Sequence, residues 1–261
     1  MRAILSIATT TVGEAIRRRV LLIILLIGLL ILTIAPGLSV LSARSETTTL
    51  VSMMYAVLQG VSALIAIILT VYMIPNEIER RTIYTILSKP VQRWQFLVGK
   101  YLGAVLALAL MMGMMSAVML CVFYFQQHPD LGRLAELAKG PLLYFVQMCL
   151  LAAVAIFFST FTTPIVNFFL SMGLYGVGTV LNPVYETFAS ASQNTIVKKL
   201  AQVITTVLPN FGNYNVQNPI INPGQQITNE LVFYINATVY GVFYIGVLLV
   251  GGILIFDRRE V

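Results

Sequence analysis

The sequence predicts an all-α polytopic membrane protein with six transmembrane helices and with both its N- and C-termini in the cytoplasm. Three observations predict this fold class. The 261 residues are 58% hydrophobic and only 10% charged, whereas soluble domains carry about 25% charged residues. Several charge-free runs reach the roughly 20 residues that an α-helix needs to cross a bilayer. Finally, Lys and Arg gather on one side of the resulting topology.

Residues 1–19 are expected to form a helix in the membrane interface. Ile4, Ala8 and Val12 place apolar side chains at helical spacing, and Arg2 and Glu14 belong to the polar complement. An amphipathic helix of this kind lies in the plane of the interface. The basic residues before the next apolar run also resemble the start of a signal peptide, but the charge-free run at 20–41 exceeds the about 7–15 residues of a signal core. We therefore interpret it as the first span.

The other charge-free runs place the remaining spans. The run from 140 to 185 is too long for one crossing at about 1.5 Å per residue. It is interrupted by a polar stretch at 159–164, which predicts two helices joined by a tight turn. Helices are preferred to barrel strands because these segments are apolar throughout, whereas barrel strands alternate. The chain is thus expected to be a single transmembrane domain, 1–261, with spans at 20–41, 52–74, 98–125, 140–160, 164–182 and 231–256.

The basic residues predict the orientation. With both termini in the cytoplasm, the cytoplasmic segments hold 11 of the 16 Lys and Arg residues, and the ten acidic residues divide equally between the two sides. This distribution follows the positive-inside rule. It accounts for the whole formal charge of +6, so no nucleic-acid partner is needed to explain that charge.

The connection at 183–230 is expected to form a long outer loop of two parts. An apolar stripe near period 3.6 predicts an amphipathic helix on the outer leaflet. Its residues are Ile196, Val197, Leu200, Val203, Ile204, Val207 and Leu208. The following stretch, 209–226, is rich in Asn, Pro, Gln and Gly, which indicates a loop with turns at 218–219 and 222–224.

Residues 75–97 form the expected cytoplasmic coupling segment. Asn76 with Glu79 three positions later is typical of a helix start, and Pro90 ends the helix. The same charges also suit a loop that merely anchors the helices under the positive-inside rule. A more specific feature is the residue pattern itself, which combines Glu77, Glu79, Arg80, Thr82, residues 87–91, Arg93 and residues 96–101.

This pattern resembles the intracellular coupling loop of ABC transporter permeases of the exporter-related ABC-2 type. The basic C-terminus, residues 256–260, is similar to that of the branch associated with multicopper-enzyme maturation. The resemblance implies a permease subunit in the plasma membrane of a prokaryotic cell, paired with a second permease as a homodimer or heterodimer. Each copy would dock its coupling helix on a separate ATP-binding cassette subunit. The implied interface residues are Glu77, Ile78, Glu79, Arg80, Arg81, Thr82, Ile83, Thr85, Ile86, Leu87, Ser88, Lys89, Pro90 and Arg93.

The expected function is therefore to couple ATP hydrolysis by the partner to export or extraction of an amphiphilic or membrane-associated substrate. This chain has no GxxxxGK[ST] phosphate loop. We thus expect it to be no enzyme and to bind no cofactor, with ATP and Mg on the partner subunit. Two alternatives are mechanical transmission to an outer-side protein partner without transport, and a structural membrane subunit without an ATPase.

Other features give weaker predictions. Met111, Met115 and Met119 share a helical face and could be soft copper ligands, but methionine also packs well in apolar cores, so we expect no metal site. Gly99, Gly103 and Ala107 would allow close helix approach, either within the chain or between two copies. The polar residues within the spans suggest a substrate path. They are Gln59, Ser62 and Asn167.

Overall fold

The computed structural model describes residues 2–39, 46–79, 92–191, 208–214 and 229–258, and every regular element in these ranges is a helix. The side chains at 2, 39, 46, 78, 79 and 181–191 are outside this description. The elements are α1 (Arg2–Arg17), α2 (Arg19–Ser39), α3 (Glu46–Val71), α4 (Pro75–Glu79), α6 (Arg93–Gln127), α7 (Leu131–Ser159), α8 (Pro164–Ala191), η1 (Phe211–Tyr214) and α10 (Glu230–Arg258). Most of the predicted coupling helix, at 80–91, and of the predicted amphipathic helix, at 196–207, lies outside the described residues.

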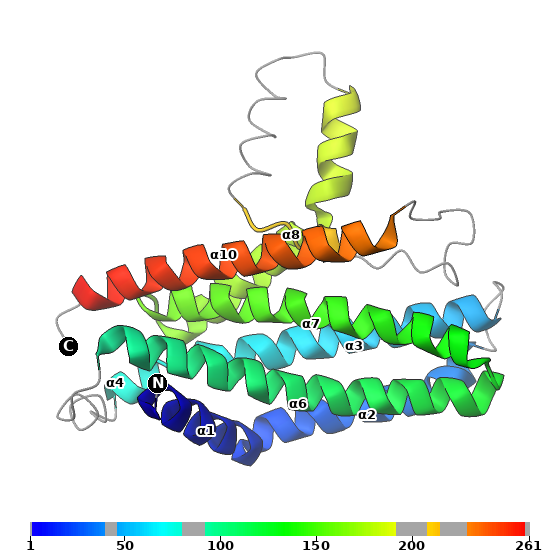
Figure 1. Cartoon of the computed structure of the whole chain (residues 1–261), viewed down its shortest axis with the longest axis horizontal. Coiled ribbons are helices and arrows are strands. Elements are labelled where there is room, and N and C mark those ends of the chain that lie inside the picture. The colour runs from blue at the N-terminus through cyan, green and yellow to red at the C-terminus, as the bar shows by residue number, and fades with distance from the viewer. Residues whose placement is uncertain (1, 40–45, 80–91, 192–207, 215–228, 259–261) are drawn as a thin grey trace.

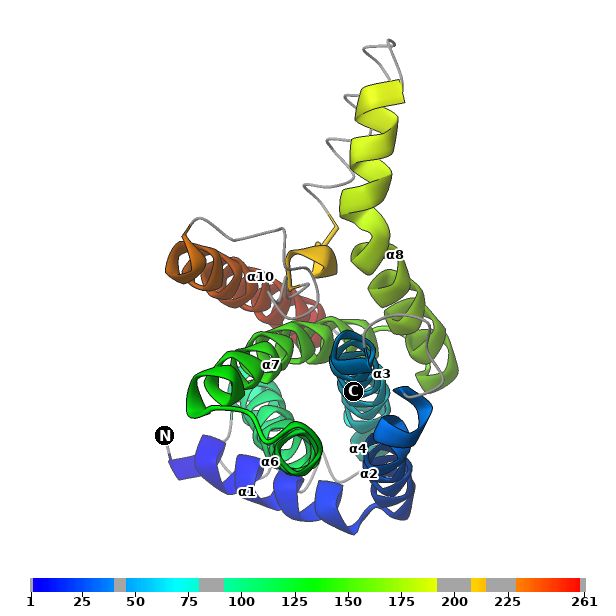
Figure 2. The ribbon, with the colours of Figure 1, turned by 90° about the vertical axis from the view of Figure 1, so that its right-hand side faces the viewer.

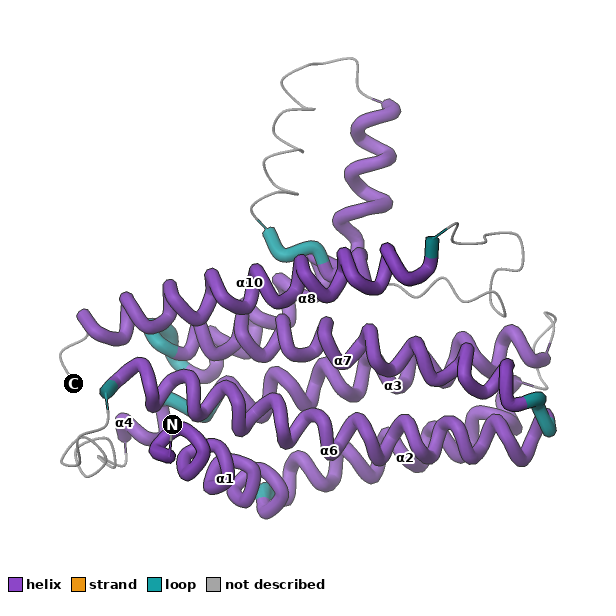
Figure 3. Tube along the Cα trace, in the orientation of Figure 1, coloured by secondary structure: helices purple, strands orange, loops and turns teal. Residues whose placement is uncertain are grey.

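The long helices α2, α3, α6, α7 and α10 run alongside one another as a bundle (Figures 1 and 3). Each of these five helices is long and apolar enough to cross a membrane. The apolar part of α8, Pro164–Val180, is shorter. The later half of α8 then leaves the bundle sideways, as both ribbon views show (Figures 1 and 2). The chain is thus a helical, multi-pass membrane protein, and the sixth crossing stays a prediction.

Several helices are longer than the apolar runs that mark them in the sequence. The clearest case is α7, which begins at Leu131 rather than near residue 140. Its first turns carry Glu136 and Lys139, whose charged atoms lie 2.7 Å apart. Lys139 also pairs with Glu230 of α10 at 3.0 Å. A charge-free run marks only the part of a helix that suits hydrocarbon, so paired charges extend α7 beyond it.

Local signals fix where the helices begin and end. The capping box of Gln92 and Gln95 starts α6. At the other end His128 adopts the left-handed conformation, with φ 44°, and its N–H donates to the Tyr124 carbonyl. The chain therefore turns back into α7 within three residues. Pro164 opens α8, a position where its missing N–H costs no helical hydrogen bond.

Helix α1 lies across α6 with very close backbone approach (Figure 2). A Cβ atom added at Gly103 would lie 2.5 Å from Thr11 Cβ and 2.8 Å from the Ala8 carbonyl oxygen. At Gly99 it would lie 3.0 Å from Ile7 Cβ. The prediction that small residues of this helix serve close packing within the chain is confirmed at these two positions.

The methionine-rich face of α6 lies in the core of the bundle. Met115 and Met119 are fully buried, and Met111 is nearly so. Such flexible side chains fill irregular gaps between helices. Their contacts here are those of packing residues in one large apolar core that includes α2, α3, α6 and α7.

Candidate coupling site

The expected coupling segment begins at α4, at the end of the bundle where the N-terminus, the start of α6 and the end of α10 also lie (Figure 1). Of the predicted interface residues, Glu77 and Arg93 have described side chains. Ile78 and Glu79 are placed as part of the α4 backbone. The predicted interface residues between 80 and 90 lie outside the described residues. The described site therefore consists of the two anchored ends of the segment.

Lys100 joins three elements at the first anchor. Its ammonium nitrogen Nζ lies 2.7 Å from Glu77 Oε1, next to the end of α4, and 3.7 Å from Glu14 Oε2 on α1. Only 5% of the Lys100 side chain is exposed, compared with 16% for Glu77 and 55% for Glu14. A buried ammonium group is stable only where an opposite charge compensates it. Glu77 is the main partner because it is both closer and more buried.

The aromatic residue Phe96 extends this anchor toward the C-terminus. Lys100 Nζ lies 5.8 Å from the centroid of the Phe96 ring, a cation–π distance. The Phe96 ring in turn stacks on Phe256 of α10, with centroids 6.3 Å apart and an interplanar angle of 21°. The ion pair and the end of α10 are thus connected through one side chain of α6.

Arg93 forms the second anchor. Its Nη1 atom donates hydrogen bonds of 3.1 Å to the backbone carbonyls of Phe256 and Asp257. The last carbonyls of a helix have no partner within that helix, and a cation there also suits the negative end of the helix dipole. The guanidinium carbon lies 5.9 Å from the Phe256 ring centroid. Arg93 therefore caps α10 from the first turn of α6.

This arrangement fixes the two ends of the segment at 75–97 to different helices. Displacement of the residues between these ends would act on α1 and α6 through Lys100 and on α10 through Arg93. Sequence reasoning did not assign Lys100, Glu14 or Phe256 to the site. One signal was available: Lys100 is a lone charge where α6 becomes apolar, and Glu14 is the only acidic residue before position 46.

The three residues suggested for a substrate path lie on two helices, α3 and α8. Gln59 of α3 donates to Gln147 Oε1 of α7 at 3.0 Å. Asn167 of α8 donates to the Ala155 carbonyl at 2.9 Å and accepts from Ser171. Within the described residues, the fully buried Ser62 hydroxyl has no hydrogen-bond partner. Gln59 and Asn167 thus make helix-to-helix contacts, whereas Ser62 has no such role.

The segment around η1 packs between α7, α8 and α10, where Phe211 and Tyr214 are buried. Gln147, in the middle of α7, donates from Nε2 to the Phe211 carbonyl at 3.0 Å. The Tyr214 hydroxyl donates to the Ala237 carbonyl at 3.1 Å, and the Asn210 N–H donates to the Tyr240 hydroxyl at 2.8 Å. Part of the connection predicted as an outer loop therefore packs against these helices. Sequence reasoning missed this contact because Gln147 and Phe211 are 64 positions apart in the sequence.

Comparison with known proteins supports the resemblance seen in the coupling segment. The model of the family described as ABC-2 family transporter protein matches residues 5–261, which is nearly the whole chain. Among curated proteins, none matches the chain significantly. The match extends over the bundle, both anchors and the segment around η1. The chain therefore belongs to the ABC-2 transporter family and is a multi-pass permease subunit of an ABC transporter.

Proposed function

We propose that this permease converts ATP hydrolysis on a separate ATP-binding subunit into movement of its membrane helices, and thereby exports or extracts an amphiphilic substrate. The buried ion pair between Lys100 and Glu77 is the observation that carries the proposal. Breaking such a pair leaves an uncompensated charge at a cost of about 3–5 kcal/mol. The two groups therefore move together, and α4 transmits its displacement to α6.

The proposed topology has six crossings, with the coupling segment and both termini in the cytoplasm of a prokaryotic cell. Helix α8 would supply the sixth crossing. An even number of crossings places both ends of the chain on one side. The N-terminus and the end of α10 lie at the same end of the bundle, which supports this topology (Figure 1). The positive-inside rule assigns that end to the cytoplasm.

At that end, residues 77–90 and Arg93 would dock on the ATP-binding subunit, which would hold ATP and Mg. A second permease would pair with this one, and ATP-driven closure of the two ATP-binding subunits would displace both coupling segments. Two anchors at the ends of the segment favour this mechanism, because a segment held at one end only would swing without moving the helices.

Charge reversal within the coupling segment tests the proposal. We expect Arg80→Glu with Arg81→Glu to reduce co-purification of the ATP-binding subunit and to lower the ATPase activity of membranes. Arg133→Glu is the matched control, because Arg133 is an exposed cation at the opposite end of the bundle. Unchanged co-purification and ATPase activity in the double variant would exclude an ATPase-coupled function and favour a structural subunit.

The orientation has its own test. A cysteine replacing Tyr84, in a background without Cys121 and Cys149, should react with a membrane-impermeant thiol reagent only after the cytoplasmic side is opened. Labelling of intact cells at position 84 would invert the topology and overturn the proposal.

The polar residues Gln59, Ser62 and Asn167 are proposed to border the substrate path. Ser62 is the most informative of them, because no hydrogen bond to a described residue explains its buried hydroxyl. Ser62→Ala should therefore alter substrate flux while leaving the thermal stability of the purified permease unchanged. A loss of stability without a change in flux would assign Ser62 to packing instead.

A second candidate function is mechanical transmission to an outer-side protein partner without transport. The hydrogen bonds of Gln147 and Tyr214 favour it, since they would carry a movement of α7 or α10 to the residues at 183–230. ATP-dependent flux of an amphiphile in vesicles that contain the permease and its ATP-binding subunit distinguishes the two functions. Transport predicts flux, and transmission predicts none.

A further inference from the structure

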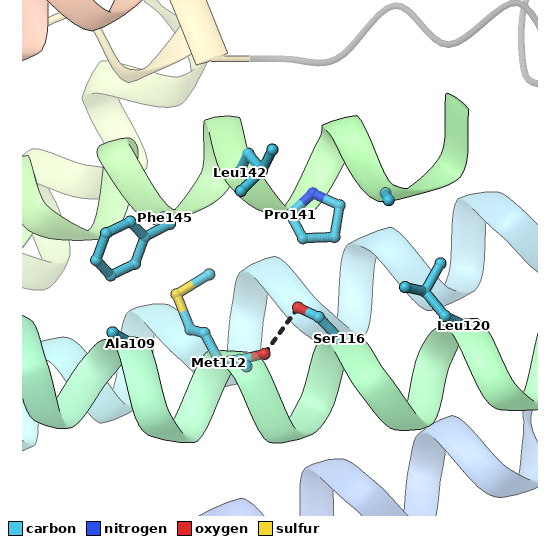
Figure 4. Close-up of a pocket in the computed structure, with 9 residues that line it drawn as sticks. Ala109, Met112, Ser116, Leu120, Pro141, Leu142 and Phe145 are labelled. Atoms are coloured by element: carbon cyan, nitrogen blue, oxygen red, sulfur yellow. Dashed lines mark hydrogen bonds between the residues drawn. The ribbon is translucent and has the colours of Figure 1, made fainter. Parts of the chain in front are cut away.

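Helices α6 and α7 leave a slot between them that opens on the outer surface of the bundle (Figure 4). The slot has a volume of about 290 Å³. Its walls include the small residues Ala109, Gly113 and Ser116 of α6 and Ala138 and Pro141 of α7. A Cβ atom added at Gly113 would meet no atom within 4 Å. The small side chains on both helices therefore leave this space open.

The slot offers little polar surface to a ligand. Its one hydroxyl, on Ser116, donates to the Met112 carbonyl of its own helix at 2.7 Å (Figure 4). The wall that Pro141 contributes has no N–H to offer. Met112, Leu120, Leu142 and Phe145 complete the lining, and no charged residue belongs to it. Only an apolar occupant would enter without losing hydrogen bonds to its surroundings.

The length and depth of the slot correspond to one leaflet of a bilayer. Residues 109–120 extend about 16 Å along α6, and they end about 10 Å before the helix ends at Gln127, at about 1.5 Å per residue. Half of the hydrocarbon core is about 15 Å thick. The slot thus lies along the acyl chains of the leaflet nearer the connection between α6 and α7.

The rim of the slot favours a hydrocarbon chain over a second helix. A helix with its side chains is about 10–12 Å across. Leu110 and Met114 on α6 and the lining residue Leu142 on α7 are exposed to 53%, 53% and 68%, so large side chains project from the surface at the rim of the slot. A helix would rest on these side chains and leave the slot empty, whereas a single hydrocarbon chain is narrow enough to pass between them.

We propose that this slot binds one acyl chain of a membrane phospholipid, which lies along α6 and α7 and completes their packing. The occupant is a resident of the bilayer, and the proposal does not depend on which substrate the permease moves. The acyl chain would make van der Waals contacts that the small residues cannot make with one another. An empty space between helices loses dispersion energy on every wall.

Photo-crosslinking tests the proposal. The full-length permease is reconstituted in phosphatidylcholine vesicles in which a fraction of the lipid carries a diazirine midway along one acyl chain, and adducts are mapped by mass spectrometry after irradiation. We expect adducts on Met112 and Phe145 to exceed those on Val239 and Phe243 of α10, which are exposed to 61% and 68%. Similar adduct levels at both places would overturn the proposal.

Filling the slot provides the matched comparison. Gly113→Phe should lower the adducts on Met112 and Phe145 to the α10 level. Gly246→Phe, at an equally open position on α10, should leave them unchanged. Ala138→Leu fills the slot from the opposite wall and serves if the first variant does not fold. Retained adducts in a folded, filled variant would contradict the proposal, as would disulfide crosslinks that join Gly113→Cys to a second copy of the chain.

Discussion

The hydroxyl of Tyr55 on α3 donates a 2.9 Å hydrogen bond to the backbone carbonyl of Leu137 on α7. The residue four positions after Leu137 is Pro141, which has no N–H and so cannot make the helical hydrogen bond to that carbonyl. Tyr55 is 3% exposed and Leu137 is fully buried. Because an unpaired carbonyl is costly in an apolar environment, the tyrosine compensates for the proline on a different helix.

Tyr55→Phe should therefore destabilise the protein by about 1–3 kcal/mol, the cost of an unsatisfied buried group. The measurement is unfolding of the purified permease in mixed micelles by increasing amounts of a denaturing detergent. Tyr72→Phe is the control, because Tyr72 is 42% exposed near the end of α3. Equal stability of the two variants would mean that the Leu137 carbonyl finds another donor.

Gly103→Ala should separate α1 from α6. The added methyl group would meet the Ala8 carbonyl at 2.8 Å, and a backbone carbonyl moves only if α1 moves with it. We expect lower thermal stability and a weaker ATPase response to nucleotide in the assembled transporter. Gly113→Ala on the same helix has open space and should be neutral or stabilise by up to about 1 kcal/mol through helix propensity. Equal effects of the two changes would show that α1 shifts to accommodate the added methyl group without loss of stability.

The two carboxylates around Lys100, those of Glu77 and Glu14, should differ in their coupling energy with Lys100. In double-mutant cycles with Lys100→Met, we expect Glu77→Gln to give a coupling energy of about 1–3 kcal/mol, as for groups in direct contact. Glu14→Gln should give about 0–1 kcal/mol, because its side chain is 55% exposed and 3.7 Å away. Stability of the four variants in each cycle provides the measurement. A larger coupling for Glu14 would assign the main link to α1 rather than to α4.

Gln147→Met should loosen the segment around η1, because it removes the hydrogen bonds to Gln59 and to the Phe211 carbonyl. A cysteine replacing Gly212, in a background without the native cysteines, should then react faster with a water-soluble thiol reagent. Thr238→Val is the control, since the Thr238 hydroxyl bonds only to the Tyr234 carbonyl of its own helix in the described structure. An unchanged labelling rate would mean that the aromatic contacts of Phe211 hold the segment alone.

Much of the helical framework could be predicted from local features of the sequence. The apolar run that ends near Ser159 and resumes at Pro164 corresponds to the end of α7 and the start of α8. Gly99 and Gly103 were recognisable as a surface for close approach. The extension of α7 back to Leu131 was not predictable from hydropathy, because it depends on Lys139 meeting Glu230 on another helix.

The candidate site likewise combines features that the sequence predicts with contacts that it does not. The sequence by itself determined which segments become helices in a membrane, because every backbone group in lipid must be satisfied within its own segment. Only the tertiary structure decided which polar side chains meet. Lys100 finds Glu77 across 23 positions, and Gln147 finds Phe211 across 64. In an apolar helix every face looks alike in the sequence, so the partner of a lone polar residue is set by packing.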